Sequence, residues 1–399
     1  MANTIYNKWV AVWGNAMSIA EHRPESYAKD ITLKYPIYTP FDGDSIRLTF
    51  DNFCGTEDVT IDKVTVSVSN GGEKAVADTF VAASFATARG QYSDIQKRTS
   101  VNSVTIPAGQ KVVTDDIAYE IKAGQTLLVS FYLQDFTQMR SAVLTTGKLS
   151  KAYFGIGDMT EVAVPDIDLT KSTKWFYFLS DVDVHTTEDK HALICYGDSI
   201  TAQDWPDELA LIMRENGVSD MSVVRKAASG TRILREYSCI TYESYGLKGE
   251  NRVPREFDVA GADTIIIQQG INDIIHPVGT KVNKFRPMSD LPTIEEMGAG
   301  IDRYIEEAGI KGFDIYLGTL LPIYGWRTYE DFREDMKNDF NNSLKGKVDV
   351  DHLIDFHKAV EDPADSRKFA DGYDSGDHLH PSVSAYHRMA EEAYKHICK

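Results

Sequence analysis

The sequence predicts a protein of two domains: a β-sandwich or jelly roll over residues 1–185, and an α/β domain with a parallel sheet flanked by helices over residues 186–399. Three observations support this prediction. The 399 residues exceed the roughly 250 to 300 that one hydrophobic core usually organises. Apolar and polar residues alternate in the first part of the chain. In the second part, short apolar runs alternate with helical patterns.

Strands of the first domain are predicted by a hydrophobic period of two. The alternation is clearest in three segments, at Ile46, Leu48 and Phe50, at Val64, Val66 and Val68, and at Leu127, Val129, Phe131 and Leu133. Turn-forming pieces such as Asn70-Gly71-Gly72 separate the runs, and no long helical pattern lies between them. Regularly spaced short strands of this kind indicate a sandwich or jelly roll.

The polar stretch at residues 186–190 marks the expected boundary between the domains. Beyond it come five short apolar runs, at residues 192–196, 221–224, 264–267, 313–317 and 353–356. Each run is apolar enough for a strand that is buried on both faces, as strands of parallel sheets are. The second domain is therefore expected to contain a five-stranded sheet.

Helix candidates lie between these runs. Residues 205–215 place Trp205 and Leu209 on one face, with Asp204 as a possible N-cap and Gly217 after the last turn. Further candidates are residues 301–308, 329–344 and 384–397. Because strands and helices alternate, we expect a parallel sheet with helices on both faces.

The charge balance excludes one class of function. Lys and Arg number 42 and Asp and Glu number 60, so the formal charge is −18. This argues against a nucleic-acid-binding protein, because phosphate binding needs a basic surface. It also slightly favours a neutral substrate.

The sequence has no run close to the roughly 18 apolar residues of a membrane span, and its start lacks the pattern of a signal peptide. We expect a cytoplasmic protein that binds no membrane, with secretion left open if a signal segment precedes this sequence; homo-oligomer formation is also open. The four cysteines, Cys54, Cys195, Cys239 and Cys398, include no closely spaced pair. They indicate neither a disulfide scaffold nor a zinc ribbon.

Polar residues that can carry chemistry occur in four loops of the second domain. They follow the first, second, third and last expected strands, and they read Gly197-Asp198-Ser199-Ile200-Thr201, Ala228-Ser229-Gly230-Thr231, Gly270-Ile271-Asn272-Asp273 and Asp377-His378-Leu379-His380-Pro381. In open parallel sheets, ligands bind beyond the carboxyl ends of the strands. We therefore expect the four loops to meet at one edge of the sheet.

These residue types suit acyl transfer. Ser199 is the candidate nucleophile, His380 the base that takes its proton, and Asp377 the carboxylate that orients the imidazole. An Asp three residues before a His can reach it within one turn of chain. The backbone N–H groups of Ser199 and Gly230 and the side-chain amide of Asn272 are the candidate donors of an oxyanion hole. This chemistry needs no cofactor and no metal.

The four motifs occur in the order and chain position of the four blocks of the SGNH/GDSL hydrolase family, which the sequence resembles as a set. The resemblance implies a flavodoxin-like hydrolase domain, a triad of Ser199, Asp377 and His380, and an oxyanion hole that includes Gly230 and Asn272. Residues 361–365 and 373–377 are similar to a bacterial subgroup that carries a β-rich domain before the hydrolase. One departure is Arg225-Lys226-Ala227-Ala228, where the family often has Asn and Gly.

Other interpretations of single residues stay open. Asp374, Asp377, His378 and His380 could instead form a metal cluster, although Ser199 and Asn272 would then lack an explanation. Residues that could contact substrate are Trp205, Arg232, Tyr324 and Trp326, each with packing or a salt bridge as the alternative. His191, His352 and His357 are most simply ordinary polar residues.

The sequence thus predicts a serine esterase that hydrolyses acetyl or short-chain acyl esters through an acyl-enzyme. The expected partner is a small-molecule or oligosaccharide ester, and the expected substrate is carbohydrate-linked. A longer-chain lipase or thioesterase with the same triad is the alternative within enzymes. A catalytically inactive carbohydrate-binding protein is the alternative from another class.

Overall fold

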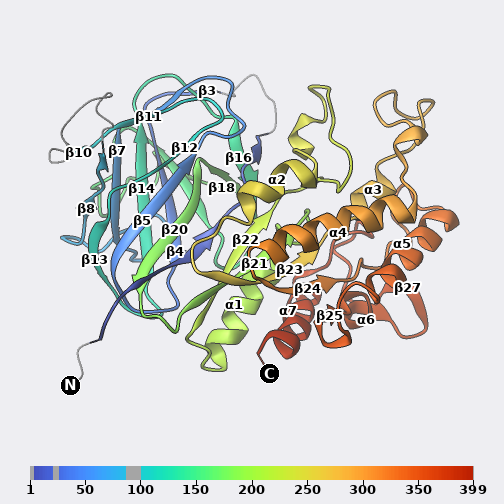
Figure 1. The fold of residues 1–399 in the computed structure, drawn as a ribbon. Coiled ribbons are helices and arrows are strands. Elements are labelled where there is room, and N and C mark those ends of the chain that lie inside the picture. Colours follow the sequence, from blue (N-terminus) through green and yellow to red (C-terminus); the bar gives the residue numbers. More distant parts are fainter. Residues whose placement is uncertain (1–3, 21–26, 87–99, 399) are drawn as a thin grey trace. The chain divides into compact units, whose positions relative to one another are not determined.

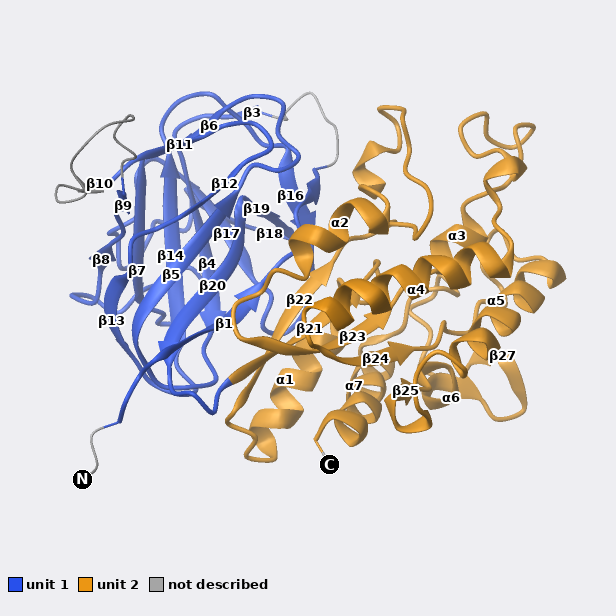
Figure 2. Cartoon of the chain, in the orientation of Figure 1, with its two compact units in different colours: residues 1–190 blue, residues 191–399 orange. Residues whose placement is uncertain are grey.

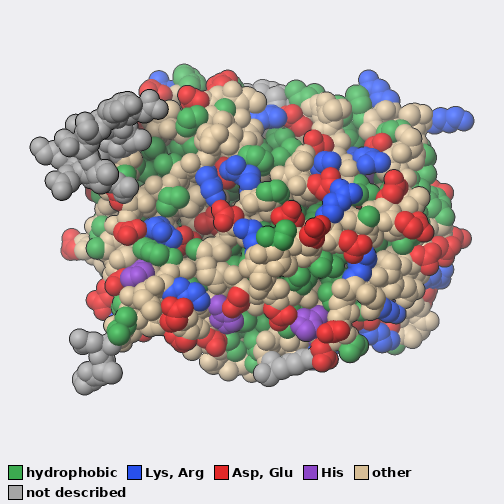
Figure 3. Space-filling model, in the orientation of Figure 1, with side chains coloured by type: hydrophobic (Ala, Val, Ile, Leu, Met, Phe, Trp, Pro, Cys, Tyr) green, Lys and Arg blue, Asp and Glu red, His purple; other side chains and the backbone are tan. Residues whose placement is uncertain are grey.

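The computed structural model describes residues 4–20, 27–86 and 100–398 (Figure 1). The chain divides into two compact units, residues 1–190 and residues 191–399, coloured separately in Figure 2. In the view of Figure 3, basic side chains lie scattered among acidic ones. Within the described residues, no helix combines the length and the apolar character needed to cross a bilayer.

Unit 1 is β-rich and contains two large antiparallel sheets. The first has the order β1 (Lys8–Gly14), β20 (Leu179–Thr186), β5 (Gly43–Asp51) and β12 (Lys111–Val113), with β13 (Ile117–Ile121) also paired to β5. The second has the order β18 (Thr170–Thr173), β17 (Ala152–Ile156), β4 (Ile31–Tyr38), β14 (Thr126–Leu133), β7 (Lys63–Val68) and β8 (Val81–Ala82). Shorter strands are β2 (Ser18–Ile19), β3 (Tyr27–Ala28), β6 (Val59–Ile61), β9 (Phe85–Ala86), β10 (Ser100–Val101), β11 (Val104–Ile106), β15 (Thr137–Gln138), β16 (Ser141–Leu144) and β19 (Trp175–Tyr177).

The three segments with period-two alternation form β5, β7 and β14. Val129 of β14 stands opposite Tyr35 on one side and Val66 on the other. The rings of Phe50 and Phe131, one from each large sheet, meet at 5.2 Å between centroids. Such a contact suits two facing sheets, and the sandwich or jelly-roll arrangement stays a prediction.

Unit 2 contains the predicted parallel sheet. Its strand order is β22 (Met221–Ala227), β21 (His191–Gly197), β23 (Ala262–Gln268), β24 (Asp314–Gly318) and β25 (Leu353–Ile354), and every pair is parallel. Numbered along the chain this order is 2-1-3-4-5, that of flavodoxin-like sheets, which reverses between the first and third strands. The loops after β21 and β23 therefore flank the crevice where such sheets bind ligands.

Helices cover both faces of this sheet. The predicted helices are present as α1 (Trp205–Glu215), α4 (Ile294–Ile310), α5 (Asp331–Leu344) and α7 (Val383–Ile397). Right-handed crossovers in opposite directions place α1 and α4 on opposite faces, and Figure 2 shows α7 beside α1. Asp204 stands at the N-cap position of α1, but its side chain makes no capping hydrogen bond.

Several short elements were not among the predictions. They are α2 (Gly249–Glu256), α3 (Ile271–Ile275), α6 (Phe356–Val360), the 3₁₀ turns at Glu243–Tyr245, Met288–Asp290 and Val350–His352, and the hairpin of β26 (Glu361–Asp362) and β27 (Asp365–Phe369). Helix α4 begins seven residues before the predicted start, because Thr293 and Glu296 form a capping box there.

Candidate functional site

The four polar loops lie at the carboxyl edge of the parallel sheet, as the strand directions require. Ser199 follows β21 and Gly230 follows β22. Asn272 lies in α3, which follows β23, and Asp377 and His380 lie between β27 and α7.

Ser199, His380 and Asp377 form one chain of hydrogen bonds. The Oγ atom of Ser199 lies 2.9 Å from Nε2 of His380, although 181 residues separate the two in sequence. On the other side of the ring, Nδ1 lies 2.7 Å from Oδ2 of Asp377. This is the geometry in which a hydroxyl can lose its proton to an imidazole that a carboxylate orients.

Asp377 is held as an anion by its own loop. Its Oδ1 atom accepts hydrogen bonds from the backbone N–H groups of Leu379 at 3.0 Å and His380 at 2.8 Å. Burial raises the pKa of Asp377, but the hydrogen bonds from the His380 ring and from the backbone outweigh burial and hold the pKa below its ordinary value. The carboxylate is thus charged near neutral pH, and it draws the proton of the imidazole to Nδ1.

The loops at this edge of the sheet contain three candidate donors. No described residue accepts a hydrogen bond from the backbone N–H of Ser199 or of Gly230. The side-chain amide of Asn272 donates one N–H to the carbonyl of Thr231 at 3.1 Å, which leaves its second N–H available. These are the groups that the sequence predicts as an oxyanion hole.

Gly230 occupies a position that other residues cannot take without strain. Its φ angle is +80°, and a Cβ atom there would lie 2.6 Å from the ring of Tyr245. The ring of Tyr245 also stacks on His276, with 4.9 Å between centroids. Because His276 follows Asn272 by one helical turn, this aromatic pair joins the Gly230 loop to α3.

Two further carboxyl groups are fully buried beside the loops. Burial raises the pKa of Asp198 to about 7 and that of Asp273 to about 6, from an ordinary value of 3.8. Asp198 accepts the N–H of Ile200 at 3.0 Å. Asp273 accepts the N–H groups of Ile233 and Leu234 at 2.8 and 3.1 Å, which shapes the chain after Gly230.

Arg252 of α2 contacts two of the loops, and the sequence analysis did not find it. Its guanidinium is buried and paired with Glu256 at 2.6 Å. It also donates to the carbonyl of Gly197 at 3.3 Å and to the hydroxyl of Thr231 at 2.9 Å. One side chain thus ties the loop that carries Ser199 to the loop that carries Gly230. The only local signal is the spacing of Arg and Glu by four residues, which many helices share.

The residues proposed to contact substrate lie in different settings. Trp205 is 0% exposed and packs on Phe356, which fits the packing alternative. Arg232 is 2% exposed and pairs with Asp290 at 3.5 Å, which fits the salt-bridge alternative. Tyr324 is 39% exposed, and Trp326 is half-buried.

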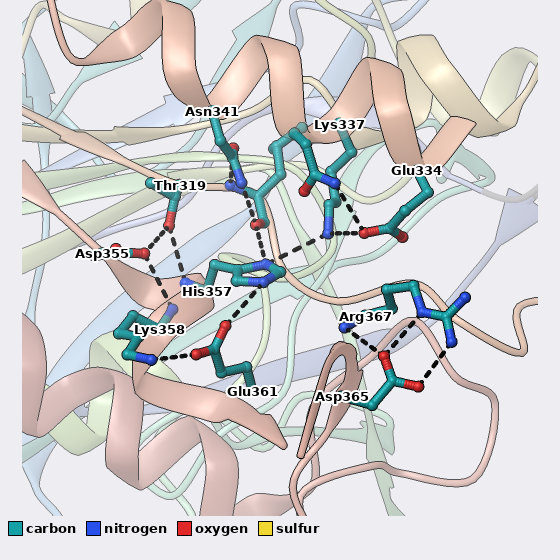
Figure 4. Close-up of polar contacts among 12 residues, drawn as sticks. Thr319, Glu334, Lys337, Asn341, Asp355, His357, Lys358, Glu361, Asp365 and Arg367 are labelled. Carbon is teal, nitrogen blue, oxygen red and sulfur yellow. Dashed lines mark hydrogen bonds and ion pairs between the residues drawn. The ribbon is translucent and has the colours of Figure 1, made fainter. Parts of the chain in front are cut away.

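A largely buried polar network surrounds His357, whose Nδ1 atom also lies 3.3 Å from the carbonyl oxygen of Leu320, in the loop that carries Tyr324. At the centre of Figure 4, His357 lies between Lys337, whose Nζ atom is 3.5 Å from Nδ1, and Glu361, whose carboxylate is 3.3 Å from Nε2. Lys337 also pairs with Glu334 at 2.7 Å. Burial and the charge of Lys337 lower the pKa of His357. His357 is thus part of a structural network, and His191 and His352 instead make partly exposed pairs with Asp263 and Asp314.

The side chains that could instead form a metal cluster, those of Asp374, Asp377, His378 and His380, are arranged as two separate pairs. His380 contacts Asp377, and His378 contacts Asp374 at 2.5 Å. No group of three or more potential ligands converges in a way that could hold a metal ion among the residues that the structure describes.

Comparison with known proteins places residues 193–393 in a protein family described as GDSL-like Lipase/Acylhydrolase. No curated protein matches the sequence. Similar solved structures include a catalytic mutant of an acetylxylan esterase from Geobacillus stearothermophilus, with 16% identity, a TM-score of 0.39 and coverage of 52% of this chain and 94% of that chain. A putative acylhydrolase from Bacteroides fragilis has 15% identity, a TM-score of 0.38 and coverage of 52% and 86%. The lipase/acylhydrolase from Enterococcus faecalis has 16% identity, a TM-score of 0.37 and coverage of 52% and 95%.

Proposed function

Since the chain belongs to the GDSL-like lipase/acylhydrolase family, we propose that it is a serine esterase that removes acetyl or other short acyl groups from a carbohydrate. The observation that carries the proposal is the hydrogen-bonded chain from Ser199 through His380 to Asp377, with distances of 2.9 and 2.7 Å. A nucleophile, a base and an orienting carboxylate in this order are what acyl transfer requires.

The reaction follows from the positions of these groups. Ser199 Oγ attacks the ester carbonyl while Nε2 of His380 takes its proton, and Asp377 stabilises the imidazolium that forms. His380 then gives the proton to the departing alcohol oxygen, which leaves an acyl-enzyme. A water molecule attacks the acyl group, gives its proton to His380 and releases the acid, after which Ser199 regains its proton.

The oxyanion that forms in each step needs donors fixed in advance. The N–H groups of Ser199 and Gly230 have no acceptor among the described residues, and the amide of Asn272 retains one free N–H. Donors that are already oriented stabilise developing charge without reorganisation. This supports the assignment of these three residues to the oxyanion hole.

A carbohydrate ester suits the surroundings of the triad. Tyr324, in the loop after β24, is 39% exposed, and an aromatic side chain of this kind can line a sugar site. The net charge of −18 favours a neutral ligand over an anionic one at long range. Hydrolysis of acetate, octanoate and palmitate esters measures the chain-length preference, and a maximum at acetate separates the esterase from the lipase alternative.

The deciding experiment compares release of p-nitrophenol from its acetate ester by the wild type and by Ser199→Ala. We expect the variant to lose at least about a thousandfold in kcat, and we expect a fluorophosphonate to label the wild type alone. Ser238→Ala, at an exposed serine of the same unit, is the matched control and should retain full activity. Full activity of Ser199→Ala would overturn the proposal, and a wild type that neither hydrolyses esters nor reacts would favour the inactive binding protein.

A further inference from the structure

A second Asp–His pair lies two residues from the proposed base. Nδ1 of His378 lies 2.5 Å from Oδ2 of Asp374, and Oδ1 of Asp374 accepts the backbone N–H of His378 at 3.0 Å. His380 is held by Asp377 in the same two ways, through its ring and through its backbone. The loop thus contains two imidazoles that are oriented alike, of which only one contacts Ser199.

The Nε2 atom of His378 is available to a ligand. The Asp374 carboxylate keeps the proton on Nδ1, so Nε2 of the neutral ring is a hydrogen-bond acceptor. It has no partner among the described residues, and the side chain is 52% exposed. A carboxylate that fixes the tautomer of an exposed imidazole prepares an acceptor at the surface.

The backbone of His378 is strained in a way that favours this role. Its φ angle is +63°, and it is the only non-glycine residue with a positive φ among the described residues 191–398. Such a conformation is unfavourable for a non-glycine residue and persists where the surroundings enforce it, often at functional sites. Here Asp374 holds the ring on one side. On the other side the ring lies so close to Gly325 that a Cβ atom there would come within 2.8 Å of it.

The proposed mechanism indicates which part of a substrate lies beside the loop of His378 and His380. His380 must protonate the alcohol oxygen as it leaves, so that oxygen must lie within hydrogen-bond reach of Nε2. The alcohol part of the ester therefore extends along the loop that carries His380. The acyl oxygen points instead to Ser199, Gly230 and Asn272. His378 is two residues from His380 in the same loop, and its ring lies against Gly325 of the loop after β24, so these two loops are the ones placed to border the alcohol part.

We propose that His378 is a specificity residue for the alcohol part of the substrate, where its Nε2 atom accepts a hydrogen bond from a hydroxyl group adjacent to the ester. The inference rests on the proposed esterase function and deepens it, since it assigns to His378 the recognition of a hydroxyl group on the carbohydrate that carries the ester. Tyr324, next to Gly325, supplies an apolar ring at the same place. Its ring is held by the guanidinium of Arg367, 4.7 Å from the centroid.

The test compares two acetate esters that differ in the alcohol. Methyl glucoside carrying one O-acetyl group retains free hydroxyls, whereas p-nitrophenyl acetate has none in its alcohol part. The variants are His378→Asn, which tolerates a positive φ, and His378→Gly, which removes the strain altogether. We expect kcat/KM for the sugar ester to fall about fivefold to tenfold in both variants, the effect of one lost hydrogen bond. For p-nitrophenyl acetate we expect a change of less than about twofold.

If His378 only maintains the conformation of the loop, the result will differ. His378→Gly would then be at least as stable as the wild type in thermal unfolding and would hydrolyse both esters normally, which would overturn the inference. Equal losses on both esters would overturn it as well, because they would show a general effect on the triad. If the wild type hydrolyses neither ester, the proposed function itself fails, so the two failures are distinguishable.

Asp374→Asn provides an independent measurement. It leaves His378 in place but removes the carboxylate that fixes the tautomer, so we expect a selective loss on the sugar ester that is smaller than that of His378→Asn. An unchanged ratio between the two esters in Asp374→Asn and in both His378 variants would count against the inference.

Discussion

Asp377 holds His380 at two points, with Oδ2 2.7 Å from the ring Nδ1 and Oδ1 2.8 Å from the backbone N–H. The two contacts fix both the position of the ring and its tautomer. Nε2 is thereby left without a proton and faces the hydroxyl of Ser199. The local spacing of three residues is sufficient for this, because the same loop supplies both partners.

Replacement of Asp377 by Asn should therefore abolish most activity without unfolding the protein. An amide can donate to Nδ1 and stabilise the wrong tautomer, in which Nε2 carries the proton and cannot accept one from Ser199. We expect kcat for p-nitrophenyl acetate to fall by about a thousandfold to ten-thousandfold, with a similar KM. Asp374→Asn, at the neighbouring pair of the same loop, is the control and should retain activity on this ester. More than a tenth of wild-type kcat in Asp377→Asn would contradict the assigned role.

Loss of the Asn272 amide should act on kcat more than on KM. Asn272→Ala removes one proposed donor of the oxyanion hole, which typically costs about a hundredfold to a thousandfold in turnover. Asn272→Asp keeps the shape but replaces the donor by an anion, so its loss should be at least as large. Steady-state kinetics on p-nitrophenyl acetate measure both. An Asp variant that is as active as the wild type would exclude Asn272 from the oxyanion hole.

Gly230→Ala should reduce both stability and activity. At φ +80° an L-residue is strained by roughly 1–2 kcal/mol, and the new methyl group would also meet the ring of Tyr245. The double variant Gly230→Ala/Tyr245→Ala relieves the clash but not the backbone strain, so it should recover part of the activity. Thermal unfolding and kcat of the single and double variants check this. A double variant with no recovery would show that the ring of Tyr245 does not limit the space at this position.

Residues whose function depends on short motifs could be predicted from the sequence, and residues whose function depends on distant neighbours could not. Ser199 and His380 belong to blocks whose order along a parallel sheet already brings them to one edge. Arg252 has no such motif, because its partners at Gly197 and Thr231 come from two other loops. For Trp205 the sequence leaves two interpretations, since an aromatic residue at a helix start suits a pocket as well as a core, and its contact with Phe356 fits the core.

The starts of helices could likewise be predicted only in part from the sequence. The start of α1 at Trp205 agrees with the prediction, because an apolar stripe begins there. Helix α4 begins earlier than predicted, since its first turns contain Glu295, Gly298 and Gly300 and lack a clear stripe. Its start depends on the capping box of Thr293 and Glu296, a local hydrogen-bond pattern that hydrophobic periodicity does not detect.

Stability should depend on pH through Asp198. Burial raises its pKa to about 7 in the folded protein, against 3.8 when it is free. Between these values the folded state binds a proton that the unfolded state has lost, so the contribution of Asp198 to stability falls as pH rises from about 4 to 7. Asn mimics the protonated side chain and cannot ionise. We expect Asp198→Asn to gain in stability over the wild type across this window, by at most about 4 kcal/mol at about 1.4 kcal/mol per pKa unit.

Thermal unfolding of the wild type and Asp198→Asn at a series of pH values checks this expectation. The difference between the two midpoints should shift in favour of the variant as pH rises, and it should level off above the folded pKa. A difference that stays constant from pH 4 to 7 would show that folding does not raise the pKa of Asp198.

Replacing Arg252 alone should destabilise the protein far more than replacing Arg252 and Glu256 together. Both side chains are buried, and their atoms approach to 2.6 Å. Arg252→Met leaves a buried carboxylate without its partner, which typically costs about 3–5 kcal/mol, whereas an apolar pair of similar volume is often neutral. We therefore expect Arg252→Met to lower the urea midpoint strongly and Arg252→Met/Glu256→Met to recover most of the loss.

The double variant should recover stability but not kcat, because neither Met can donate to Gly197 and Thr231. A double variant that folds well but has a reduced kcat would identify Arg252 as a positioning residue, and one with full kcat would limit Arg252 to a structural role.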